Sequence, residues 1–133
     1  MAQIIDGKKL GLTIRNAIAA KTIRLTKRPP ALTVILVGEN PASQVYVYNK
    51  HREAEKAGIT SKIINLPSDV TQAKLLETVE RCNRDKNIDG ILVQLPLPRQ
   101  INTHAVLEKS TQPKMSTGCI LIILGRFIQG AKV

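Results

Sequence analysis

The feature that most constrains the fold is a short apolar run, A-L-T-V-I-L-V, over residues 31–37. Prolines 29 and 30 precede it, and the turn sequence Gly38-Glu39-Asn40-Pro41 follows it. A short, β-branched and nearly all-apolar run is typical of a strand that is buried on both faces. Strands of this kind occur in parallel sheets that helices cover from both sides, so the run predicts the interior of such a sheet.

The segments around this run alternate between strand and helix patterns. Strands are also predicted over 60–66 and 88–95, and helices over 6–27, about 42–57, 71 to about 84–86, and 104–109. Gly58 is placed to end the second helix, and Thr71 to cap the third. The first helix is predicted to be amphipathic, with these apolar residues: Leu10, Leu12, Ile14, Ala17, Ile18 and Ala19. The alternation predicts an α/β fold, a three-layer parallel sheet with helices on both faces.

The net charge of the chain is compatible with two classes of partner. The chain has 133 residues with a formal net charge of +10, which fits either a nucleic-acid-binding module or a basic enzyme with an anionic substrate. The basic residues are scattered, and aromatic residues make up only 2% of the chain, which argues against base stacking. We therefore expect an enzyme and no nucleic-acid partner, with a small basic nucleic-acid-binding module as the alternative.

Cysteine and histidine give no sign of a metal site. Cys82 and Cys119 lack C-x-x-C spacing, and His51 and His104 stand alone, with His51 expected to face solvent. The N-terminus does not resemble a signal peptide, and no apolar run is long enough to span a membrane. The expected location is the cytoplasm, with no membrane partner.

Two candidate site elements follow the predicted strands, where ligands of open α/β sheets bind. Tyr46 and Lys50 are four residues apart, so on a helix they share one face. Burial would favour the neutral form of the amine and make Lys50 a competent proton donor or acceptor. Gln94 ends an apolar strand within V-Q-L-P-L-P, and its amide offers a donor and an acceptor. The alternative is a solvated helix and a hydrogen-bonded strand end.

Together these segments resemble one enzyme family. V-G-x-N-P-A-S, Y-V-x-x-K, A-G-I and D-G-I-L-V-Q-L-P-L-P occur here in the order and spacing of the bifunctional methylenetetrahydrofolate dehydrogenase/methenyltetrahydrofolate cyclohydrolases. The resemblance runs from Ile4 to about Lys109. It implies catalytic roles for Lys50, Tyr46 and Gln94, and substrate contacts from these three residues and from Val93 and Leu95.

The resemblance also implies an activity. Members oxidise 5,10-methylenetetrahydrofolate with NADP or NAD, and hydrolyse the methenyl product to 10-formyltetrahydrofolate in one-carbon metabolism. Tetrahydrofolate derivatives are the implied partners, and members form homodimers. Members continue into a Rossmann cofactor domain, and we expect this chain to lack it, because the sequence stops at Val133 and contains no G-x-G-x-x-G or P-loop sequence. We therefore expect this fragment to bind no cofactor and to be inactive as printed.

The tail indicates a shifted reading frame. Residues 114–123 read K-M-S-T-G-C-I-L-I-I, and a shift back by one nucleotide permits K-D-V-D-G-x-H-P-x-N, which resembles a family signature. The second restored aspartate, which holds the pterin in the family, falls at Thr117. We predict a catalytic domain over 1–109, a frame-shifted segment over 110–124, and the start of the connection to the cofactor domain over 125–133. A non-functional pseudogene product is a further alternative.

Overall fold

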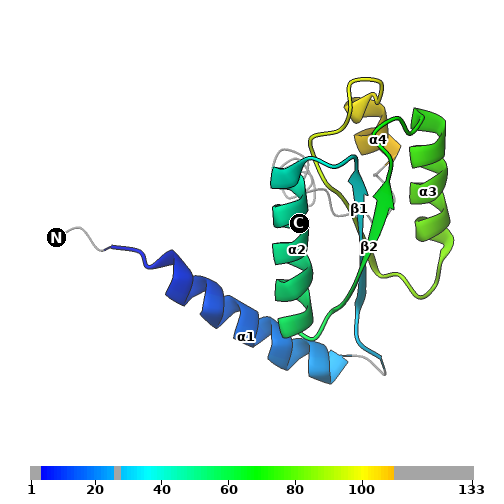
Figure 1. Cartoon of the computed structure of the whole chain (residues 1–133). Coiled ribbons are helices and arrows are strands. Elements are labelled where there is room, and N and C mark those ends of the chain that lie inside the picture. The colour runs from blue at the N-terminus through cyan, green and yellow to red at the C-terminus, as the bar shows by residue number, and fades with distance from the viewer. Residues whose placement is uncertain (1–3, 26–27, 110–133) are drawn as a thin grey trace, which may run out of the picture.

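The core of the protein is a sheet of three parallel strands (Figure 1). A computed structural model describes residues 4–25 and 28–109, so the predicted frame-shifted segment lies outside the described residues. Strand β1 (Ala31–Val37) lies between β2 (Thr60–Leu66) and β3 (Gly90–Val93). The last five residues of β1, from Thr33 onward, are buried. The apolar run is therefore the central strand, as predicted.

Helices cover both faces of the sheet, which confirms the three-layer prediction. Helix α2 (Pro41–Lys56) lies on one face, and α3 (Gln72–Arg84) and α4 (Thr103–Lys109) lie on the other (Figure 1). Beneath α2, Val47 packs with strand residues Val34, Leu36 and Leu92. The opposite cluster is larger and includes Ile35, Leu75, Val79, Ile91 and Val106. Alternate residues of β1 thus enter two separate apolar clusters.

Helices α2 and α3 each begin at a residue whose side chain caps the helix, close to the starts that the sequence predicts. The Asn40 side chain accepts a hydrogen bond from the Ser43 N–H at 3.1 Å, and Pro41 occupies the first turn of α2. The Thr71 hydroxyl accepts one from the Lys74 N–H at 3.2 Å. Such caps satisfy N–H groups that have no partner within the helix.

The predicted third strand is too long at both ends. Ile88 precedes β3 because its N–H donates to the Asp85 carbonyl within a turn, at 3.2 Å. At the other end, register pairing with β1 stops at Val93, and a single further bond joins the Gln94 N–H to the Ile35 carbonyl at 2.9 Å. Gln94 therefore lies just beyond the end of β3, at the edge of the sheet.

Helix α1 (Gly7–Leu25) forms as predicted, but most of its large apolar side chains are exposed. Its side chains Leu10, Leu12, Ile14 and Ile18 are 40–54% exposed. Its N-terminal half projects away from the layers (Figure 1). An Arg15–Glu53 ion pair and a 2.8 Å hydrogen bond from the Thr22 hydroxyl to the Ala57 carbonyl join it to the C-terminal half of α2. None of the described helices is long and apolar enough to cross a membrane.

Gly58 allows α2 to end beside α1. Its φ is +75°, and a Cβ there would lie 3.0 Å from the Thr22 hydroxyl. Gly58→Ala is expected to lower the free energy of unfolding by about 1–2 kcal/mol, because side chains are disfavoured in the left-handed region. Gly11→Ala is the matched control: Gly11 lies inside α1 with open space around its Cα, so alanine should stabilise by about 0.5–1 kcal/mol. Urea unfolding measures both, and an equal response would contradict the left-handed helix end.

Candidate functional site

Gln94 is held at the carboxyl edge of the sheet by its own backbone and side chain. It is 9% exposed and follows Val93, which is 3% exposed. Its side-chain nitrogen donates to the Leu95 carbonyl oxygen at 2.6 Å. The sequence did not reveal this bond, because a backbone carbonyl leaves no residue-type signal. It turns the amide so that the Gln94 Oε1 atom is available to a donor from elsewhere.

Lys50 supplies that donor. Its Nζ atom lies 2.8 Å from the Gln94 Oε1 atom, so α2 and the end of β3 meet at this hydrogen bond. The two residues are 44 positions apart, and the predicted convergence of the two motifs is therefore observed. The side chain of Lys50 is exposed rather than buried. Lys50 reaches the sheet edge from the side of α2 rather than from beneath it.

Tyr46 lies one turn before Lys50 on the same flank of α2, as the spacing predicts. It is 60% exposed, which leaves a phenol ring beside the lysine ammonium group. An ammonium carries three N–H donors, and Gln94 takes one of them. The other two can bind an acceptor on a ligand, while the ring offers a flat surface for stacking. This arrangement suits a planar ligand with an electron-rich edge.

The loop after β1 does not form a phosphate cradle. Gly38 has a φ of +82°, and its N–H donates to the Leu66 carbonyl at 2.9 Å. The N-terminus of α2 is already capped by Asn40. These bonds explain the V-G-E-N-P-A-S segment as a strand-to-helix turn, and agree with the weak nucleotide-binding signal of its sequence.

The two histidines do not take part in this site. The His51 side chain is only 29% exposed, and its Nε2 atom lies 3.5 Å from a Glu55 carboxylate oxygen, so the expectation that it faces solvent is only partly met. His104 is exposed on α4. Within residues 4–25 and 28–109, no three His, Cys, Asp or Glu side chains form a group that could hold a metal ion.

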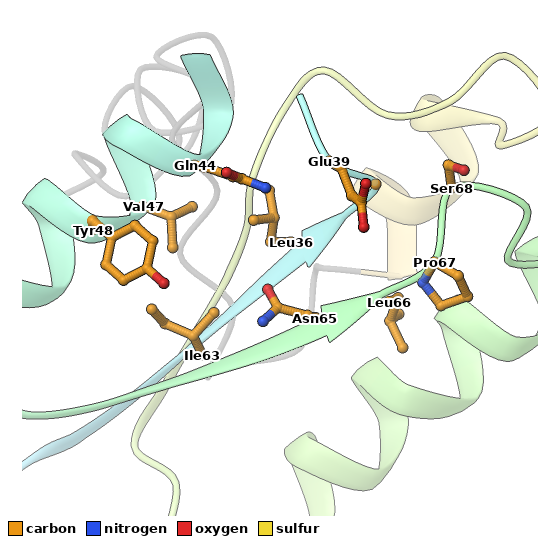
Figure 2. Close-up of a pocket in the computed structure, with 11 residues that line it drawn as sticks. Leu36, Glu39, Gln44, Val47, Tyr48, Ile63, Asn65, Leu66, Pro67 and Ser68 are labelled. Atoms are coloured by element: carbon orange, nitrogen blue, oxygen red, sulfur yellow. The ribbon is translucent and has the colours of Figure 1, made fainter. Parts of the chain in front are cut away.

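A separate hollow of about 600 Å³ lies between α2 and β2 (Figure 2). Its polar lining includes Glu39, Tyr48 and Asn65, and it contains none of the candidate residues at the Lys50–Gln94 pair. The hollow is therefore a different feature of the surface from the Lys50–Gln94 pair. The sequence analysis did not single it out, since its residues come from three segments without a recognisable motif.

Residues 5–114 match the model of the tetrahydrofolate dehydrogenase/cyclohydrolase catalytic domain. The chain belongs to the tetrahydrofolate dehydrogenase/cyclohydrolase family. Among curated members, the bifunctional protein FolD of Cupriavidus necator is 46% identical over 132 residues, and that of Streptococcus suis (strain 98HAH33) is 45% identical over 133. Each match covers 98% of this chain and 47% of the relative.

Solved structures of the family share the fold. FolD from Campylobacter jejuni gives a TM-score of 0.79 at 40% identity, over 83% of this chain and 40% of that one. The Trypanosoma brucei enzyme, solved with NADP cofactor and an inhibitor, gives 0.75 at 34% identity, over 81% and 38%. The chain thus spans about half the length of the curated relatives it matches, and corresponds to their catalytic domain.

Proposed function

We propose that this chain is the folate-binding part of an enzyme that oxidises 5,10-methylenetetrahydrofolate with NADP and hydrolyses the product to 10-formyltetrahydrofolate. The hydrogen bond between the Lys50 ammonium and the buried Gln94 amide carries the proposal. It joins the two motifs on which the family resemblance rests, although they lie on different elements. The match to the family's catalytic domain over residues 5–114 supports the same assignment.

Each residue has a distinct role in this proposal. Tyr46 stacks on the flat pterin, and the backbone of Val93 and Leu95 lies against its edge. Gln94 orients Lys50, which assists proton transfer and the attack of water on the methenyl carbon. Because Gln94 is anchored by the Leu95 carbonyl, the ammonium is held in place before the substrate arrives.

The described residues do not fit a dinucleotide cofactor. The Gly38 N–H is bonded to Leu66, and Asn40 caps the helix that follows, so this turn offers no Gly-rich phosphate cradle. NADP is bound by the Trypanosoma brucei relative, of which this chain covers 38%. We therefore assign no step of hydride transfer to residues of this chain.

The printed chain is expected to reduce no NADP when it is mixed with 5,10-methylenetetrahydrofolate. The reason is that hydride transfer needs the acceptor to be held against the folate carbon. Absorbance of the reduced cofactor measures the rate, and the Cupriavidus necator protein serves as the positive control. Turnover by the pure, folded chain would contradict the assignment of the cofactor site to residues beyond this catalytic part.

The frame-shift proposal is tested at the level of DNA. Residues 110–124 lie outside the described structure, so only the nucleotide sequence can decide the matter. Resequencing from the Ala105 codon past the Val133 codon is expected to show that the D-V-D-G segment is recovered by one single-nucleotide change. A nucleotide sequence that encodes the printed tail and offers no D-V-D-G in the neighbouring frame would refute the shift.

A further inference from the structure

We infer that the hollow between α2 and β2 is a second binding site, which takes an unphosphorylated flat heterocycle of nucleoside size with adjacent ring N–H and amino groups. The inference does not depend on the proposed folate function, because it rests on other residues. Tyr46 and Lys50 lie on one flank of α2, whereas Gln44 and Tyr48 lie on the opposite flank. A helix thus separates the two sites.

The size and walls of the hollow suit a small ring system. Its volume of about 600 Å³ falls within the range of pockets that hold small molecules. Its apolar lining includes Leu36, Val47 and Ile63, and the first two are almost fully buried in the cluster beneath α2. A flat ligand can therefore rest on a rigid apolar surface without displacing an element of the fold.

Polar side chains from three elements reach into this space. Figure 2 shows Gln44 and Tyr48 entering from α2, Asn65 from β2, and Glu39 from the turn after β1, with the Tyr48 hydroxyl directed toward Asn65. Within the described part of the chain, no hydrogen bond satisfies the side chains of these four residues. Two amides, a phenol and a carboxylate are thus available to a ligand.

The charges in the hollow select the class of ligand. No lysine or arginine lines it, although the whole chain carries a net charge of +10. A phosphate or carboxylate ligand would face Glu39 with no cation to balance it, and is therefore disfavoured. A carboxylate accepts two parallel hydrogen bonds from neighbouring N–H groups, such as the ring N–H and amino group of guanine. The Tyr48 ring, 66% exposed, can stack on such a base.

Guanosine is the probe for this site, titrated into the full 133-residue chain by calorimetry. We expect saturable binding, about tenfold weaker for inosine, which lacks the amino group, and no tighter for guanosine monophosphate. Glu39→Gln and Tyr48→Leu should each weaken guanosine binding about tenfold, because they remove the charged acceptor and the stacking ring. Both side chains are exposed, and a thermal unfolding curve confirms that each variant is folded.

Matched variants on other surfaces distinguish this site from the folate site. Glu77→Gln on α3 and Tyr46→Leu on the opposite flank of α2 should leave guanosine binding unchanged. Absence of saturable binding would overturn the inference. So would a loss of binding in Tyr46→Leu but not in Tyr48→Leu, which would place the ligand beside Lys50, or tighter binding of the monophosphate, which would show that a phosphate is recognised.

Discussion

Restoring the two aspartates of the predicted D-V-D-G segment should tighten tetrahydrofolate binding by about one to two orders of magnitude. The triple variant carries Met115→Asp, Ser116→Val and Thr117→Asp, so that the pterin edge meets a carboxylate instead of a hydroxyl. A hydrogen bond to a charged group contributes roughly 1.5–3 kcal/mol, and about 1.4 kcal/mol corresponds to a tenfold change in affinity. Calorimetric titration of both chains measures the difference.

A neutral version of the same segment is the control. Replacing Thr117 by Asn in an otherwise identical triple variant retains the size of the side chain but removes its negative charge. Its affinity should fall well short of that of the aspartate variant, since an amide cannot accept the paired hydrogen bonds of a carboxylate. Equal affinities of the printed, asparagine and aspartate chains would show that position 117 does not meet the pterin.

The triple variant with the D-V-D-G segment is called the restored chain below. In this chain, Lys50→Met is expected to weaken tetrahydrofolate binding by tenfold or more and to lower the free energy of unfolding. The ligand loses a charged donor, and the Gln94 Oε1 atom loses the partner that lies 2.8 Å away. Because Gln94 is 9% exposed, an unsatisfied acceptor there costs about 1–3 kcal/mol. Titration and urea unfolding report the two effects separately.

Two variants separate the charge of Lys50 from its position. Lys50→Arg retains a donor for Gln94 and should preserve stability, but its planar group does not place the charge as an ammonium does. Lys56→Met removes an exposed lysine from the same helix, where it pairs with Glu53 at 3.0 Å. That change should leave folate binding unaffected, because surface ion pairs contribute little. Comparable losses in Lys56→Met and Lys50→Met would contradict a specific role for Lys50.

Much of the fold follows from local sequence patterns. The run from Ala31 to Val37 is typical of a strand covered on both faces, and Asn40 and Thr71 are residue types that satisfy the free N–H groups of a helix start. The meeting of Lys50 and Gln94 also followed, because both residues come from segments at the carboxyl edge of a parallel sheet.

Other features depend on contacts that no local pattern encodes. The apolar residues of α1 have helical spacing, but spacing cannot show that Arg15 and Thr22 join this helix to the rest of the described domain while its leucines stay exposed. The exposure of Lys50 depends on how α2 is rotated over the sheet. The hollow beside Tyr48 is formed by three separate segments, and its residues become a group only in the folded chain.

The most direct test of the folate site is a tetrahydrofolate titration of the restored chain and of two glutamine variants. Gln94→Leu removes the acceptor that positions Lys50, whereas Gln100→Leu removes a loop contact to the Ser68 carbonyl. We predict saturable binding that is at least tenfold weaker in Gln94→Leu and unchanged in Gln100→Leu. Absence of binding by the folded restored chain, or equal affinity in both variants, would contradict the assignment of the Lys50–Gln94 pair as the folate site.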